Sequence, residues 1–193
     1  MCGRFVITSA PAALRQLFGY VEQPNFPPRY NVAPTQMIGA IAEIESLRQI
    51  SSFKWGLIPS WAKDDSIGNK LINARAETLR EKPSFREAFR SRRCIIPASG
   101  FYEWQKTSNG AKQPFYFYLK EKEVFGFAGL WEEWLDKQTG ELSETCTIIT
   151  TEANEALKPI HDRMPVILKS DEYDFWLDEK VKDTNKLQNL LVP

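Results

Sequence analysis

The sequence predicts an α+β fold, a single domain with a mostly antiparallel β-sheet or barrel-like core and a few short peripheral helices. Short runs of β-type residues follow one another along most of the 193 residues, and turn signals rather than regular helices separate them. This pattern is typical of sheets whose neighbouring strands run antiparallel. The length suits one domain with a core of its own, so residues 1–193 are expected to form one unit.

The strands are expected where apolar and β-branched residues gather between turn residues. In chain order they are Arg4–Thr8, Met37–Ala42, Leu47–Trp55, Cys94–Pro97, Phe101–Lys106, Phe115–Lys120, Val124–Trp131, Glu144–Thr150 and Val166–Leu168. Asn109-Gly110 predicts a hairpin turn, and Asp136 to Gly140 predicts a second one. The proline-rich segment Pro24–Pro34 is expected to be a loop.

Few helices are expected. Ser9 followed by Pro11 predicts a helix start, and Ser84 with Glu87 has the spacing of a capping box. The expected helices are Ala12–Leu17, Phe85–Arg92, Thr151–Leu157, Asp171–Leu177 and Lys182–Leu191.

Charge and cysteine content exclude several classes of protein. The 25 basic and 25 acidic residues give a net charge of zero, so any nucleic acid must meet positive charge concentrated on one face. Three widely spaced cysteines without a C-x-x-C pair argue against a disulfide framework or a zinc cluster. The first residues do not form a signal peptide, and no apolar run could cross a membrane. We expect a cytoplasmic monomer, nucleoid-associated if bacterial, without metal or cofactor.

Cys2 follows the initiator methionine, and its small side chain makes removal of Met1 easy. Removal would leave an amine and a thiol on one residue, a pair that attacks an aldehyde twice and closes a thiazolidine ring. The α-amine has a pKa of about 8, against about 10.4 for lysine, so more of it is neutral at pH 7. The alternative for Cys2 is a small apolar residue buried in a strand.

Two titratable residues are candidates for proton transfer. His161, the only histidine, stands in a polar segment fixed by Pro165, and imidazole titrates near physiological pH. Glu103 lies between Tyr102 and Trp104, so in a strand its side chain points away from theirs, and an enclosed position would raise its pKa. The alternatives are a structural histidine at a strand entry and a surface glutamate.

Polar residues at a spacing of two favour a groove for an anion. Asn73 and Arg75 share one side of an extended segment, Arg4 shares a side with Cys2, and Arg163 with His161. Guanidinium groups suit phosphate. An exposed Trp61 could stack on bases. For each arginine the alternative is a surface charge or a structural ion pair.

Seven blocks of the chain, in this order, resemble the SRAP (SOS response-associated peptidase) family. They are Met1–Phe5, Arg29–Pro34, Trp55–Pro59, Leu71–Thr78, Gly100–Trp104, Gln113–Phe115 and Ile160–Pro165. Each block is weakly specific, but the ordered set is highly specific. The resemblance implies a protein that crosslinks abasic sites in single-stranded DNA, at junctions with duplex DNA, and so protects them during replication.

The resemblance also implies roles for single residues. Cys2 would form the thiazolidine after the protein removes its own Met1, Glu103 would act as acid and base and reverse the crosslink, His161 would help to open the deoxyribose, and Asn73 would orient the reacting groups. The residues implied in DNA binding are Arg4, Asn31, Trp61, Arg75 and Arg163.

The chain departs from the family pattern in two places. Some relatives carry paired tryptophans where this chain has Trp61-Ala62, which predicts weaker stacking at a DNA junction. Relatives usually continue past the position of Pro193, so the expectation is either that the C-terminal end is truncated or that the last strand is absent.

Two other functions fit the same residues. One is a thiol peptidase or N-terminal-nucleophile amidohydrolase acting in trans, with His161 as the base for Cys2. The other is a non-catalytic binder of modified or single-stranded DNA, whose binding would depend on salt and survive loss of the Cys2 thiol.

Overall fold

The computed structural model describes residues 2–21 and 26–193, which form twelve strands and a few short helices. The strands are β1 Arg4–Ile7, β2 Arg29–Val32, β3 Met37–Ile44, β4 Leu47–Trp55, β5 Asn73–Arg75, β6 Arg93–Ala98, β7 Gly100–Lys106, β8 Lys112–Phe117, β9 Phe125–Leu135, β10 Leu142–Glu152, β11 Arg163–Pro165 and β12 Ile167–Leu168. The α-helices are α1 Pro11–Phe18, α2 Arg86–Ser91, α3 Tyr173–Leu177 and α4 Thr184–Gln188. Three 3₁₀ turns, η1 Asp65–Lys70, η2 Ala76–Thr78 and η3 Ser170–Glu172, complete the set.

Five strands close into a barrel. β10 pairs with β4, β4 with β3, β3 with β6, β6 with β9, and β9 again with β10. All of these pairings are antiparallel except that between β10 and β4. The fold class predicted from the sequence is therefore confirmed, and closure leaves the central strands without a free edge.

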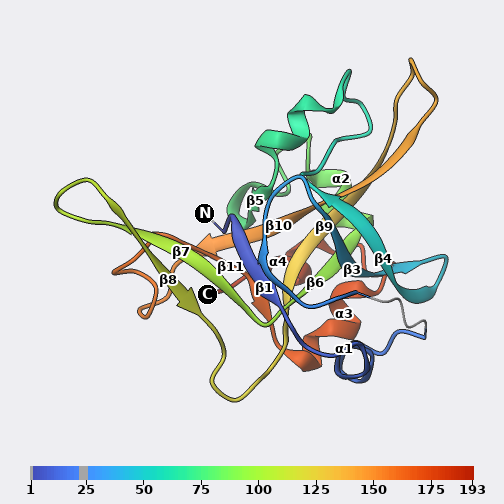
Figure 1. Ribbon diagram of the computed structural model, residues 1–193. Helices are drawn as coiled ribbons and strands as arrows, with labels where there is room; N and C mark the ends of the chain where they lie inside the picture. Colours follow the sequence, from blue (N-terminus) through green and yellow to red (C-terminus); the bar gives the residue numbers. More distant parts are fainter. Residues whose placement is uncertain (1, 22–25) are drawn as a thin grey trace.

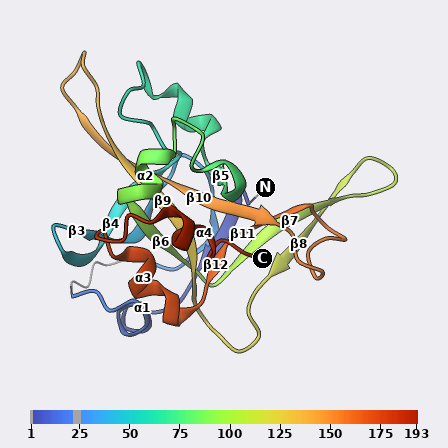
Figure 2. The same cartoon turned by 180° about the vertical axis from the view of Figure 1, so that it is seen from behind.

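A second, four-stranded sheet lies against the barrel in the order β2-β1-β7-β8. β1 is an inner strand, paired with β2 on one side and β7 on the other. The β7–β8 hairpin projects from the molecule on the side away from α1 and α3, as Figures 1 and 2 show from opposite directions. The short strand β5 pairs in parallel with β10 and places its residues next to the start of β1.

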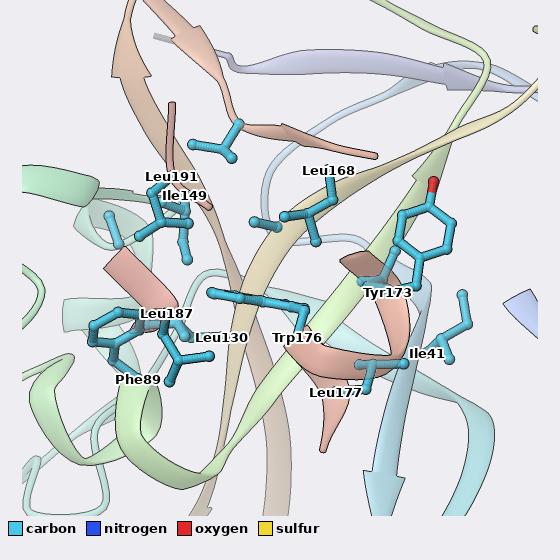
Figure 3. Close-up of a cluster of buried hydrophobic side chains, with 14 of the residues drawn as sticks. Ile41, Phe89, Leu130, Ile149, Leu168, Tyr173, Trp176, Leu177, Leu187 and Leu191 are labelled. Carbon is cyan, nitrogen blue, oxygen red and sulfur yellow. The ribbon is translucent and has the colours of Figure 1, made fainter. Parts of the chain in front are cut away.

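The barrel is apolar on both faces, because successive residues of a strand point to opposite sides. On β3, Ala40 and Ala42 belong to the cluster that fills the interior, whereas Ile41 belongs to the cluster outside. The outer cluster is covered by the helices (Figure 3). At its centre, the indole N–H of the fully buried Trp176 donates to the carbonyl of Cys94 at 2.9 Å.

The structure corrects several local predictions. Residues 151 and 152 continue β10, where they pair with β11, and the helix predicted over Thr151–Leu157 is wrong. The predicted Ser84 capping box is also wrong, because Phe85 stands at the N-cap of α2 without a side-chain cap. Part of the predicted loop Pro24–Pro34 is the strand β2, and residues 24 and 25 lie outside the described residues. None of the helices in the described part of the chain has the length and apolar character needed to span a membrane.

Candidate functional site

Cys2 and Asn73 meet where the two sheets come together. Cys2 precedes β1, and Asn73 opens β5, which β10 holds in register through Ile148. The Asn73 side-chain N–H donates to the carbonyl oxygen of Cys2 at 2.9 Å. In Figure 1 the start of β1 accordingly lies beside β5. This bond fixes the backbone of Cys2, and the Cys2 side chain is fully buried (0% exposed).

Glu103 approaches Cys2 from β7. Arg4 pairs with Tyr102 across β1 and β7, which places Glu103 next to the start of β1. The glutamate is only 2% exposed, whereas Tyr102 and Trp104 are half-buried, so the three side chains alternate as the sequence predicted. Burial raises the pKa of the Cys2 thiol well above its ordinary value, and the charge of Glu103 raises that pKa further. The thiol therefore stays protonated at neutral pH.

Glu103 and His161 line one cleft of about 420 Å³, which we call the Glu103 cleft. Its other lining residues are Arg4, Trp104, Lys106 and Lys112. Arg4 follows Cys2 by two residues, so the cleft adjoins the buried cysteine. The structure thus brings together Cys2, Asn73, Glu103, His161 and Arg4, five of the residues singled out in the sequence.

The His161 ring is oriented by its own segment. Its Nδ1 accepts the backbone N–H of Arg163 at 3.0 Å, which leaves the ring proton on Nε2. The same Nδ1 lies 2.9 Å from Oδ1 of Asp162, a contact that is an ion pair only when the ring is protonated. Arg163 is buried and its N–H needs an acceptor, whereas the Asp162 carboxylate is exposed to water.

A second cleft of about 430 Å³ adjoins the first, because Asp162 lines it while the preceding residue, His161, lines the Glu103 cleft. Its other residues are Arg75, Glu152, Lys158 and Arg163. His161 and Arg163 therefore belong to different clefts. Arg75 is exposed, whereas Arg163 is only 9% exposed.

Arg163 is held by a two-pronged ion pair with Glu77. Its guanidinium donates to the two carboxylate oxygens at 2.6 and 3.0 Å, and it also donates to the carbonyl of Thr150 at 2.6 Å. Burial raises the pKa of Glu77, but the hydrogen bonds and charge of Arg163 outweigh this effect and the pKa lies below its ordinary value. The pair ties η2 to β11.

Asn31 and Trp61 line neither cleft. Asn31 is exposed on β2, one residue before the pairing of Val32 with Phe5. Trp61 is 58% exposed in the loop between β4 and η1, where its indole N–H reaches the carbonyl of Pro83 at 3.5 Å. Their predicted contacts with DNA stay predictions.

Sequence reasoning missed Glu77, the partner of Arg163, and three lysines that line these clefts. Glu77 carried a signal, the two-residue spacing from Arg75, but the strand ends at Arg75 and η2 turns Glu77 toward Arg163. Lys106, Lys112 and Lys158 carried no signal that set them apart from other surface lysines. Among residues 2–21 and 26–193, no group of three or more His, Cys, Asp or Glu side chains is placed to hold a metal ion.

Comparison with known proteins gives consistent matches. The family model described as SOS response associated peptidase (SRAP) matches residues 1–193. Abasic site processing protein YoaM of Bacillus subtilis (strain 168) is 49% identical, over all of this chain and 86% of its own length. Abasic site processing protein HMCES of Xenopus tropicalis is 30% identical, over all of this chain and 70% of its own length. A crystal structure of a protein from Bacteroides thetaiotaomicron superposes with a TM-score of 0.89 at 33% identity, covering 98% of this chain and 86% of that one.

The fold and the site define a β-barrel protein whose second residue is a buried cysteine, set beside a buried glutamate and next to a cleft that holds a histidine. The family model and the relatives extend over the full length of the chain. The chain belongs to the SOS response-associated peptidase (SRAP) family.

Proposed function

We propose that this protein processes abasic sites in single-stranded DNA by forming a covalent thiazolidine through Cys2, after removal of Met1. The observation that carries the proposal is the meeting of Cys2, Asn73 and Glu103 beside a cleft that also holds His161. Similar relatives bear the name abasic site processing protein, which supports DNA with abasic sites as the substrate.

The chemistry needs an open-chain sugar, whose C1′ is an aldehyde. The freed amine of Cys2 attacks C1′, and loss of one water gives an imine. The sulfur then adds to the imine carbon, and its proton ends on the nitrogen. One water leaves in total, with no oxidant or reductant. The raised pKa of the thiol favours this order, because the neutral amine is the stronger nucleophile while the sulfur stays protonated.

Glu103 and His161 would move the protons. Opening the sugar ring and expelling water each need a proton delivered to oxygen, and the Nε2–H of His161 is a donor of the right kind. Glu103, beside the thiol, would take the sulfur's proton during ring closure and return it when the crosslink reverses. Asn73 would hold the Cys2 backbone so that both nucleophiles reach the same carbon.

Positive side chains around the two clefts would hold the DNA backbone. Arg4 lines one cleft and Arg75 the other. Arg163 would meet a phosphate by giving up part of its contact with Glu77. Asn31 and Trp61 would contact DNA outside the clefts, with Trp61 stacking at a junction between single and double strands. We propose that the protein acts as a monomer.

Removal of Met1 would be the protein's own reaction, using the same cleft to cut the peptide bond before Cys2. This cleavage, a hydrolysis that consumes one water, must come first, because the nitrogen of Cys2 becomes a nucleophilic amine only when the bond is cut. Intact mass of purified protein tests this step. Loss of one methionine is expected in the wild type, and retention of Met1 in protein that still crosslinks would contradict it.

The function is tested with abasic single-stranded DNA and no reductant. Wild-type protein should give an adduct that survives denaturation, and Cys2→Ala should give none. Cys2→Ser is the matched control, because its hydroxyl preserves the size of the side chain but closes a far less stable ring. An adduct that persists in Cys2→Ala would assign the reaction to another nucleophile.

A further inference from the structure

We propose that Lys106 and Lys112, paired across the β7–β8 hairpin, hold a phosphate of the DNA strand beyond the reacting nucleotide. The inference rests on the proposed function, since it assigns a path for the same DNA. It concerns residues that lie in the Glu103 cleft but take no part in the chemistry described above.

The pairing of the two lysines is unfavourable in the protein alone. Lys106 lies directly opposite Lys112 in the antiparallel register, and both side chains are exposed. Like charges directly opposite in a sheet destabilise it. Within the described part of the chain, neither lysine forms an ion pair with a carboxylate. An anion bound between the two ammonium groups would remove this repulsion.

The lysine pair belongs to a cleft of one dominant charge. Arg4, Lys106 and Lys112 line it together with His161, and among the described residues Glu103 is the only acid in the lining. Because the whole chain has a net charge of zero, this local excess is a concentration of positive charge. Such an excess attracts an anionic ligand into the cleft.

The hairpin is fixed relative to the reactive residues. The Gln105 side-chain N–H donates to the carbonyl of Pro159 at 2.8 Å, and Pro159 lies two residues before His161. The turn is closed by the bonds from Thr107 N to Ala111 O at 2.9 Å and from Gly110 N to Thr107 O at 3.0 Å. A phosphate on the lysines would therefore sit at a set distance from Cys2.

The separation between Arg4 and the lysine pair places the lysines beside a nucleotide that flanks the reacting one. Arg4 pairs with Tyr102, and Lys106 lies four residues further along β7 on the same face of the sheet. At a strand rise of about 3.4 Å per residue, the two positions are about 14 Å apart. Trp104 lies between them on this face and lines the cleft, where it could stack on a base. Arg4 and the lysine pair therefore hold different phosphates of one strand.

The test compares two double variants that each remove two positive charges. Lys106→Gln with Lys112→Gln changes the proposed contact, and Lys120→Gln with Lys122→Gln changes exposed lysines between β8 and β9, outside the cleft. Binding to an undamaged, fluorescent single-stranded oligonucleotide is measured over a range of salt concentrations. Crosslinking to an abasic oligonucleotide of the same length is measured in parallel.

The first variant should bind more weakly, and the slope of log K against log salt should flatten by about 0.7 for each phosphate that the protein no longer neutralises. The deficit of this variant in crosslinking should shrink as the abasic oligonucleotide is shortened on one side of the abasic position. The thermal stability of this variant should stay equal or rise, because repulsion is removed. The control should keep the wild-type slope.

An equal effect of both variants, or no change in the first, would overturn the inference. If the wild type still crosslinks abasic DNA in that case, the proposed function stands and only the lysine contact fails. If the wild type neither binds nor crosslinks, both proposals fail.

Discussion

Cys2 lies among the proposed reactive residues, but its thiol is protonated and therefore a weak nucleophile. Burial and the charge of Glu103 both raise the pKa of the Cys2 thiol. Enzymes in which a cysteine thiolate makes the first attack lower the pKa of that thiol instead. The site is therefore suited to an amine that reacts first and a sulfur that follows. Under this scheme Glu103 matters most at the step in which the sulfur loses its proton.

Replacing Glu103 by glutamine should slow crosslinking by about 100-fold or more, the range expected when a general acid–base group is removed. Glutamine has the size of glutamate but cannot take a proton from sulfur. The measurement is the rate of adduct formation at saturating abasic DNA. Glu121→Gln, at an exposed acid outside the cleft, should keep the wild-type rate. A Glu103→Gln rate close to that of the wild type would assign proton transfer to another group.

At the scale of elements, the Arg163–Glu77 ion pair should make the stability of the folded protein depend on pH. The folded protein holds the pKa of Glu77 below its ordinary value of 4.5. The stabilisation is therefore full above that value and is lost as pH falls through the lower, folded pKa. Glu77→Gln should lower the melting temperature at pH 7, and the difference from wild type should shrink as pH falls below 4.5.

Glu81→Gln is the control for this pair, since Glu81 is an exposed glutamate close by in sequence. It should show no such dependence on pH. A Glu77→Gln difference that stays constant from pH 7 to pH 3 would show that the ion pair is not its source.

The loop that carries Trp61 depends on a close contact between two glycines. Gly56 has a φ of +138°, and a Cβ placed there would lie 2.6 Å from the carbonyl oxygen of Gly68. Gly56→Ala should therefore cost about 1–3 kcal/mol of unfolding free energy, measured with urea. Gly110→Ala is the matched control, because its φ is also positive (+81°) but no atom lies within 4 Å. Equal costs would show that the conformation of Gly56, not the contact, sets the effect.

Most strands could be predicted because their signal is local. β4 was predicted with its observed bounds, and β7 to within one residue, from alternation and turn residues alone. β5 was missed because three residues are too few to show an alternation of apolar and polar side chains. Their strand conformation comes from pairing with β10. The false helix after Thr150 has the same cause, since the pairing of Glu152 with Arg163 extends β10.

The reactive residues were predictable from their types and from the family pattern, but their surroundings were not. Glu77 and Arg163 are 86 positions apart, and the pairing of both β5 and β11 with β10 brings them together. Lys106 and Lys112 of the β7–β8 hairpin become candidates for DNA binding only because they line a cleft together with Arg4 and His161, which are distant in the sequence.

At the scale of the molecule, the helices near the C-terminus stabilise the barrel from outside. Trp176 is fully buried in their contact with β6, as Figure 3 shows. Trp176→Ala should cost about 3–5 kcal/mol, which urea unfolding would measure. Phe175→Ala changes the neighbouring, partly exposed aromatic and should cost much less. Similar costs would mean that the helices contribute little through Trp176.

The position of β1 inside its sheet has a practical consequence. Chain ends usually fray, but a strand with partners on both sides is held along its length. A purification tag or fluorescent fusion joined ahead of Cys2 would keep the nitrogen of this buried residue in a peptide bond. Such fusions are expected to form no adduct until that bond is cut, either by the protein itself or by an added protease.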